Sequence, residues 1–343
     1  MTQRQTTSMR SEIAEIPDVL QRQIDQGLSH YWALGETLRD ARLKGFVTCA
    51  RGTSDQAAMF FKYLFEIHCG LPVASIGPSV GSLYKAKLQL DDFACMTFSQ
   101  SGGSPDLLAL QTAARQGGAR TVAFLNQTDS AIGKDAMTVM PILAGPEMAV
   151  AATKSYVGML FASLGVLAGY QQDDALNAAM SKLPEMARKA VDSDWLEAIV
   201  PLARAQSVFC IGRGPGLAVA GEAALKLKET CLMHAEAYSS AEVLHGPIAA
   251  ASGRFAVLLF DAKGDAQQSI DVAEQKLRAK GATVFRVSAT NGLRQAQGEA
   301  DCHPLLEPLL QAVTFYSFVE SLSVQLGLNP DAPVGLQKVT MTV

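Results

Sequence analysis

Three ionisable residues in the middle of the chain have a spacing that suits proton transfer. Glu222, Lys226 and Glu229 stand at positions i, i+4 and i+7 of a helix expected over 218–231, so they share one helical face. A carboxylate held over two neighbouring carbons can carry a proton between them, as conversion of an aldose to a ketose requires. A lysine beside it can stabilise negative charge that develops on oxygen. The alternative is a solvated face with an ordinary Glu–Lys pair.

The segment directly after this helix favours the active-site interpretation. Two of the five histidines of the chain, His234 and His245, lie there among Glu236, Tyr238 and Glu242. Because imidazole titrates close to neutral pH, a histidine suits the acid–base step that opens a sugar ring. Because these ionisable groups follow the helix so closely, a purely solvated helix face is the weaker alternative.

Hydroxyl-rich turns in the first half of the chain predict a phosphate site. Two turns that follow expected strands carry the residues concerned, which are Thr53, Ser54, Ser99, Gln100, Ser101 and Ser104. Ser104 is a candidate N-cap and Pro105 suits the first helical position, so a helix begins there. Free backbone N–H groups and the positive end of the helix dipole attract phosphate. The pattern of a nucleotide-binding P-loop does not occur in the sequence.

A structural role for these serines is the alternative, in which Ser104 caps a helix and the glycines make a turn. The corresponding turns of the second half, at 212–215 and 261–265, lack the serines, and the second carries carboxylates. Hydroxyls needed for structure alone would be expected in both halves. We therefore expect one phosphate site per chain, in the first half.

Strands alternate with helices twice along the chain, which predicts two α/β domains with parallel sheets covered on both faces. Expected strands are 46–50, 71–76, 93–98 and 120–125 in the first half, and 207–211, 255–260 and 283–287 in the second. The expected parts are a helical lead-in (1–45, interrupted at Pro17), a phosphate-binding domain (46–170), a domain with the catalytic helix (195–328) and a tail (329–343). Ligands of such sheets lie beyond the carboxyl ends of the strands.

Composition excludes several classes of protein. The chain has 343 residues, 48% of them apolar and 18% charged, as in a compact globular protein. A net charge of −4 without a basic run argues against nucleic-acid binding. The beginning of the chain has no signal-peptide core, and no segment predicts a membrane span. Six cysteines lack metal-ligand spacing, so we expect small buried hydrophobes, no metal and a reducing cytoplasm.

An ordered set of short motifs covers nearly the whole chain and resembles a known family. It consists of 9–17, Arg51-Gly-Thr-Ser54, Ser99-Gln-Ser-Gly102, Val150-Ala-Ala-Thr-Lys154, Ala224-Leu-Lys-Leu-Lys-Glu229, His234-Ala-Glu-Ala-Tyr238, His245-Gly-Pro247 and Leu336-Gln-Lys-Val-Thr340. The chain resembles the double-SIS (sugar isomerase) phosphosugar proteins, most of all the isomerase half of glucosamine-6-phosphate synthase and the stand-alone SIS-type deaminases. The resemblance implies two tandem SIS domains, each a flavodoxin-like three-layer sandwich.

The resemblance also implies roles for individual residues. Substrate binding falls to the phosphate-holding residues Thr53, Ser54, Ser99, Gln100, Ser101 and Ser104, together with Val150 and Ala151. Glu229 moves the proton between C1 and C2, Lys226 assists, and Glu222 lies on the same face. His245 opens the ring and reaches the site from the partner subunit, which implies a homodimer with a shared active site. Lys338 matches the lysine that forms an imine with the keto sugar, and no cofactor is implied.

Departures from the synthase pattern narrow the expected reaction. Thr2 stands where the synthase has its nucleophilic cysteine, Gly103 replaces a glutamate, and Leu244 replaces a lysine. We therefore expect chemistry with free ammonia: glucosamine 6-phosphate plus water giving fructose 6-phosphate and ammonia. The alternatives are galactosamine 6-phosphate deamination, fructosamine 6-phosphate deglycation, ammonia-dependent amination, or a non-catalytic sugar-phosphate sensor. The role of Glu147 is left open.

Overall fold

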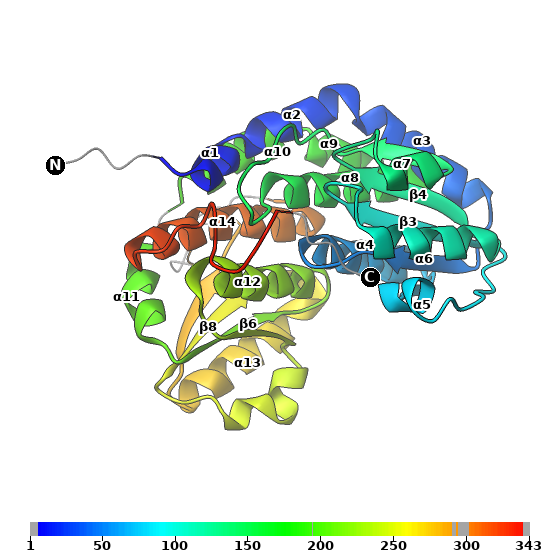
Figure 1. The fold of residues 1–343 in the computed structure, drawn as a ribbon. Coiled ribbons are helices and arrows are strands. Elements are labelled where there is room, and N and C mark those ends of the chain that lie inside the picture. The colour runs from blue at the N-terminus through cyan, green and yellow to red at the C-terminus, as the bar shows by residue number, and fades with distance from the viewer. Residues whose placement is uncertain (1–5, 194, 290–292, 294–301, 339–343) are drawn as a thin grey trace. The chain divides into compact units, whose positions relative to one another are not determined.

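The computed structural model describes residues 6–193, 195–289, 293 and 302–338, which fold into two compact units (Figure 1). We call the first the serine unit; it comprises the described residues of Asp18–Glu147, Lys154–Ser181 and Gln337–Val343. We call the second the lysine unit; it comprises the described residues of Met1–Pro17, Met148–Thr153 and Lys182–Leu336. The sequence-based domain boundaries at residues 45, 170, 195 and 328 stay predictions.

The serine unit is built on a five-stranded parallel sheet with the strand order β2-β1-β3-β4-β5. Its strands are β1 (Gly45–Cys49), β2 (Val73–Ser75), β3 (Phe93–Ser99), β4 (Arg120–Leu125) and β5 (Thr138–Pro141). Its helices are α2 (Ile16–Gln26), α3 (Leu28–Asp40), α4 (Thr53–Cys69), α5 (Pro78–Ser82), α6 (Pro105–Gln116), α7 (Ala131–Asp135), α8 (Lys154–Gln171) and α9 (Asp174–Met180).

Alternation of side chains along the strands gives this sheet two different apolar faces. On one face, ring contacts join Phe46 and Phe98 of the strands to Phe61 of α4. On the other, Cys49 and Cys95 pack in a cluster with side chains of α6. Burying each large apolar side chain stabilises the fold by about 1.5–3 kcal/mol. Both faces of the sheet are therefore covered, in the three layers predicted from the sequence.

The lysine unit repeats the plan with a four-stranded parallel sheet in the order β7-β6-β8-β9. Its strands are β6 (Ser207–Gly212), β7 (Ala235–Ser239), β8 (Phe255–Phe260) and β9 (Thr283–Val287). Its helices are α1 (Ser8–Ala14), α10 (Leu183–Val191), α11 (Leu196–Arg204), α12 (Pro215–Cys231), α13 (Gln267–Ala279) and α14 (Glu307–Gln325), with 3₁₀ turns at Glu242–His245, Pro247–Ala249, Gly264–Ala266 and Pro304–Leu306.

Two buried helices of this unit lie side by side. Helix α12 packs along α14 and against β6, β7 and β8 (Figure 1). Helix α14 is buried from Glu307 to Glu320, and its Ser317 hydroxyl donates to the carbonyl of Val191 at the end of α10. On the other face of the sheet, α13 packs against β6, β8 and β9 through Ile270 and Leu277. The face of α12 that carries the predicted proton-transfer residues is thus part of a protein interior.

The predicted α/β architecture with two parallel sheets is confirmed, and the differences concern short elements. Strands β5 and β7 and helix α5 were not expected, because each has at most five residues and the two strands lie at sheet edges. The N-terminal helical region breaks at Glu15 and again at Gly27, whereas a single interruption at Pro17 was expected; Pro17 instead lies in the first turn of α2. In the described part of the chain, no helix combines the length and apolar character needed to cross a membrane.

Candidate active site

The two hydroxyl-rich turns follow neighbouring strands of the serine unit. Thr53 and Ser54 begin α4 directly after β1, and the serine turn 99–104 joins β3 to α6. Strands β1 and β3 pair in parallel up to Cys49 opposite Thr97, so both turns leave the same edge of the sheet. From β1 the chain adds β2 on one side, and it then crosses to add β3, β4 and β5 on the other side. Ligands of doubly wound sheets bind at this switch point, between β1 and β3.

Backbone geometry shapes the serine turn. The Ser99 hydroxyl accepts from the Gly102 N–H (3.0 Å), and the Ser101 hydroxyl accepts from the Gly103 N–H (3.3 Å). Gly102 has φ of +62°, and a Cβ there would lie 2.0 Å from the Ser130 hydroxyl oxygen. Only glycine fits this position without strain. Ser99 is buried, whereas Gln100, Ser101 and Ser104 are partly exposed, as are Thr53 and Ser54.

An ion pair connects the two turns. Arg51, in the turn after β1, pairs with Asp106 in the first turn of α6. Ser104 occupies the N-cap position of α6 with Pro105 at the first helical position, as predicted, but its side chain makes no capping bond. A hydroxyl that does not cap the helix can serve as a donor to another group. The arrangement offers hydroxyls and a helix N-terminus to an anion, which is the chemistry predicted for phosphate.

Helix α12 of the lysine unit brings the three predicted proton-transfer residues together. The Lys226 ammonium lies 3.2 Å from Glu222 Oε1 and 2.7 Å from Glu229 Oε2. The side chains of Lys226 and Glu222 are 0% and 1% exposed, and that of Glu229 is 24% exposed. A fourth group comes from α14, where the Tyr316 hydroxyl donates to Glu222 Oε1 at 2.8 Å. The solvated-face alternative is therefore wrong, and of the two carboxylates Glu229 is the partly exposed one.

Burial changes the proton affinity of this cluster. Removal from water raises the pKa of Glu222 from an ordinary 4.5 to about 7, against the opposing effect of the Lys226 charge. Burial alone would lower the pKa of Lys226, but the carboxylates of Glu222 and Glu229 raise it above its ordinary value. Lys226 therefore stays a cation, while Glu222 changes charge close to neutral pH. A shifted pair of this kind is frequent at catalytic sites and also occurs in structural ion-pair networks.

The two histidines that follow α12, His234 and His245, have different surroundings. His234 precedes β7, and its Nδ1 lies 2.7 Å from the Ser207 hydroxyl, so it joins β7 to β6. His245 ends a 3₁₀ turn and is exposed, before Gly246 with φ of +156°. An exposed imidazole is available to a substrate or to a second subunit. His234 is thereby assigned to structure, and His245 keeps its predicted role as a prediction.

Glu147 and Lys338 meet in the serine unit although 191 positions separate them. The Lys338 ammonium lies 3.4 Å from Glu147 Oε2, and the Glu147 side chain is fully buried. The same carboxylate accepts from the backbone N–H and the hydroxyl of Ser155, at 3.1 and 2.8 Å. Glu147, whose role was left open, thus forms an ion pair with Lys338 of the tail. Residues Val339 and Thr340 of the tail motif lie outside the described residues.

Two further predicted substrate-binding residues, Val150 and Ala151, belong to the lysine unit. The Val150 N–H donates to the carbonyl of Asp331 at 3.0 Å, and Ala151 is buried. The Asp331 carboxylate accepts in turn from the backbone N–H groups of Ser8 and Met9. This segment is tied to the first helix and to the tail of the same unit, and its contact with a substrate stays a prediction.

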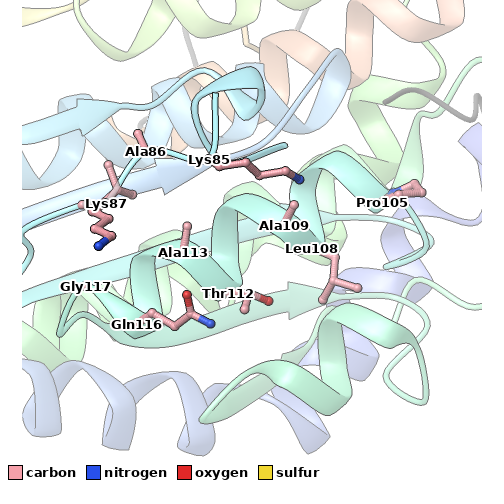
Figure 2. Close-up of a pocket in the computed structure, with 12 residues that line it drawn as sticks. Lys85, Ala86, Lys87, Pro105, Leu108, Ala109, Thr112, Ala113, Gln116 and Gly117 are labelled. Carbon is pink, nitrogen blue, oxygen red and sulfur yellow. The ribbon is translucent and has the colours of Figure 1, made fainter. Parts of the chain in front are cut away.

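A surface pocket of about 830 Å³ lies elsewhere on the serine unit (Figure 2). One face of α6, the end of α5 and the segment 85–88 form it, and its lining includes Lys85, Lys87, Leu108 and Thr112. Figure 2 shows the Lys85 side chain extended over the helix in the direction of Pro105. None of the predicted site residues lines this pocket. The pocket therefore adjoins the serine turn through Pro105 without being part of it.

Comparison with known proteins places the chain in a family. The SIS domain model matches residues 38–167 and 201–325. A glutamine–fructose-6-phosphate aminotransferase (isomerizing) of Zymomonas mobilis is 29% identical over 317 residues, which cover 87% of this chain and 52% of that protein. The chain thus spans about half the length of such curated relatives.

Solved structures agree with this result. A protein of Silicibacter pomeroyi, provisionally described as a phosphosugar isomerase, is 42% identical with a TM-score of 0.88, over 95% of this chain and 100% of that one. Glucosamine-6-phosphate deaminase of Thermotoga maritima has a TM-score of 0.77 at 19% identity, over 98% of this chain and 100% of that one, and shares the fold. The chain therefore belongs to the SIS domain family, which it matches with two segments.

Proposed function

We propose that this protein is an SIS-type sugar-phosphate enzyme that converts glucosamine 6-phosphate and water to fructose 6-phosphate and ammonia. The observation that carries the proposal is the α12 cluster, in which a buried Lys226 holds the partly exposed carboxylate of Glu229 at 2.7 Å. A carboxylate oriented by a buried cation is suited to take a proton from carbon and return it. The names of the aminotransferase and deaminase relatives support an amino sugar phosphate as the substrate.

In the proposed reaction the phosphate is held by the hydroxyls of the two turns and by the N-terminus of α6. His245 opens the sugar ring, which exposes C1 as an aldehyde. Glu229 takes the proton from C2 while O1 gains a proton, which gives an enolamine. Glu229 then returns its proton to C1 while the nitrogen loses one, so that the C2–N bond becomes an imine. Water adds to that imine, the C–N bond breaks, and ammonia leaves with fructose 6-phosphate. Lys226 stabilises the negative charge that develops on oxygen during the proton transfer.

Lys338 takes part in the proposal as the amine that can form an imine with the keto sugar. Its ammonium lies 3.4 Å from the buried Glu147 carboxylate, which holds it in place. We expect Lys338→Arg to keep the ion pair with Glu147 and to lose the step that needs a neutral amine. Trapping with borohydride in the presence of fructose 6-phosphate tests this role, with a stable adduct expected in the parent protein and none in the variant.

The decisive experiment offers glucosamine 6-phosphate and galactosamine 6-phosphate separately and measures the ammonia that purified protein releases. Release from the first, with a loss of about 10²- to 10⁴-fold in Glu229→Gln, is the expected result. Release from galactosamine 6-phosphate alone would show that the substrate is that epimer and not glucosamine 6-phosphate. Absence of release from both, together with tight binding of the sugar phosphate, would contradict the deaminase and favour a sensor.

We also propose a homodimer in a cytoplasmic setting, in which His245 acts on the site of the partner subunit. The exposure of His245 supports this proposal. Two variants that are inactive alone, Glu229→Gln and His245→Asn, test it when they are mixed and allowed to exchange subunits. If the site is shared, mixed dimers contain one intact site each and about a quarter of the activity returns. If each chain acts alone, mixing restores nothing.

A further inference from the structure

Tyr316 is a buried ionisable residue that the proposed reaction does not use. It lies in α14, is fully buried, and its hydroxyl donates to Glu222 Oε1 at 2.8 Å. The same oxygen of Glu222 lies 3.2 Å from the Lys226 ammonium. Lys226 lies 2.7 Å from Glu229 Oε2 on its other side. A continuous row of contacts therefore joins a side chain of α14 to the partly exposed carboxylate of α12.

We propose that Tyr316 is a positioning residue: its hydroxyl holds the Glu222 carboxylate in the charged form that shares Lys226 with Glu229. This inference rests on the proposed function, since it assigns Glu229 as the base. The hydrogen bond that Tyr316 donates to this cluster is to Glu222, so we assign its effect on Glu229 to Glu222. It reaches the cluster from a different helix, which fixes Glu222 from outside α12.

The physical reason lies in how one cation is divided between two carboxylates. When Glu222 is ionised, Lys226 is attracted to both carboxylates and is shared between them. When Glu222 is protonated, the charge of Lys226 acts on Glu229 alone, so Glu229 is held more strongly by the cation and is less available to the substrate. A hydroxyl that donates to the ionised carboxylate favours the first state. Tyr316 thus extends toward lower pH the range in which Lys226 is shared.

Other ionisable side chains on the elements packed against α12 are paired elsewhere or uncharged near neutral pH. On β7, the Tyr238 hydroxyl donates to Glu236 at 2.6 Å, and on β6 burial raises the pKa of the Cys210 thiol. On α14, Glu320 accepts from the Thr7 hydroxyl at 2.7 Å and Glu307 pairs with Lys263 at 2.8 Å. Strand β8 carries no ionisable side chain. Besides burial, which raises the pKa of Glu222, the described groups that shift this pKa include Lys226, Glu229 and Tyr316.

The test replaces Tyr316 by phenylalanine and compares it with Tyr31→Phe. Tyr31 is also fully buried and also donates through its hydroxyl, to the carbonyl of Pro141 in the serine unit. The pH dependence of kcat/KM is measured with the hexosamine 6-phosphate that the parent protein turns over. We expect the acid limb to move upward by about one pH unit in Tyr316→Phe, with about tenfold lower kcat/KM on that limb. At alkaline pH the variant should approach the parent.

A second readout keeps the inference testable without turnover. The free energy of unfolding, measured with urea, should fall as Glu222 ionises in the folded protein, and in Tyr316→Phe this fall should extend about one pH unit higher. Tyr31→Phe should shift neither profile. If the parent releases no ammonia but the unfolding profile moves, the proposed function fails and the link between Tyr316 and Glu222 stands. Unmoved profiles in Tyr316→Phe, or equal movement in Tyr31→Phe, would overturn the inference.

Discussion

The turns after β1 and after β6 have the same backbone conformation but carry different side chains. Gly52 and Gly214 precede α4 and α12 with nearly identical angles, φ 59° and ψ −133° in the first, φ 54° and ψ −132° in the second. An arginine comes before each glycine, but the next residue is Thr53 in one unit and Pro215 in the other. Proline supplies neither a hydroxyl nor a backbone N–H. The repeated turn therefore keeps its shape in both units, while the donors suited to an anion occur in the serine unit.

The second turn of each sheet extends the comparison. After β3 the serine unit has the hydroxyls of 99–104, with the nearby Asp106 carboxylate paired to Arg51. After β8 the lysine unit has Asp261, which Arg286 holds at 2.5 Å. In the lysine unit the candidate catalytic residues lie instead on the buried face of α12. A repeated fold thus supports two functions because side chains at corresponding turns differ while the backbone is retained.

The largest expected effect comes from removing the buried cation of the lysine unit. Lys226→Met leaves Glu222 in the interior without that partner, and we expect a loss of about 3–5 kcal/mol in the free energy of unfolding at pH 8. The matched control is Lys228→Met on the same helix, where the side chain is exposed and the change should stay within about 0.5 kcal/mol. Urea denaturation measures both, and equal effects would contradict a buried cluster.

The pH dependence of stability should belong to the lysine unit. Because the pKa of Glu222 is raised from 4.5 to about 7, the protonated form is favoured by folding. This contribution is complete below pH 4.5 and is lost as the pH rises through 7, by about 3 kcal/mol in total. In Glu222→Gln the decline over this range should disappear. A decline that persists unchanged in that variant would assign it to other groups.

The shared backbone of the two turns predicts equal costs for equal substitutions. Gly52→Ala and Gly214→Ala each place a Cβ on a residue with positive φ, and for Gly52 no neighbouring atom lies within 4 Å of that Cβ. We expect each to lower the free energy of unfolding by about 1–2 kcal/mol. Gly103→Ala in the serine turn, where φ is not positive, should cost less. A difference of more than about 1 kcal/mol between Gly52→Ala and Gly214→Ala would contradict the equivalence of the two turns.

The smallest effect concerns the residue that distinguishes the turns. Thr53→Pro gives the serine unit the residue that begins α12, so the helix should still form. Loss of a hydroxyl and an N–H should weaken binding of inorganic phosphate about tenfold. Thr53→Ala, which keeps the N–H, should weaken it less. Calorimetric titration with phosphate distinguishes the two variants, and unchanged affinity in both would remove Thr53 from the phosphate site.

Elements that are encoded by a short run of neighbouring residues could be predicted from the sequence, whereas elements defined by contacts with distant residues could not. Strands β1, β3, β4, β6 and β8 are buried apolar runs, so their positions were predicted to within about two residues. Strand β7 has the sequence Ala-Glu-Ala-Tyr-Ser, which reads as polar because it lies at the edge of its sheet. Such a strand is defined by its pairing with β6, which no local pattern reveals.

The candidate site shows the same limit. Spacing on one helix was enough to group Glu222, Lys226 and Glu229, because an α-helix places such positions on one face. Tyr316 joins them from 94 positions away, and Lys338 reaches Glu147 from 191 positions away. Their partners are determined by the packing of distant segments. In sequence alone, Lys338 is an ordinary lysine of the tail, and no local pattern connects Tyr316 with the helix that carries Glu222.

The most direct test of separate roles for the two units, phosphate binding in one and proton transfer in the other, measures binding and turnover together in Glu229→Gln. Calorimetry gives the affinity for the sugar phosphate, and ammonia release gives kcat, with the exposed Glu185→Gln as the control. We expect an affinity within about threefold of the parent and a kcat lower by about 10²- to 10⁴-fold, since the serine unit holds the phosphate and Glu229 moves the proton. A variant that turns over at the rate of the parent, or that loses binding and turnover equally, would contradict it.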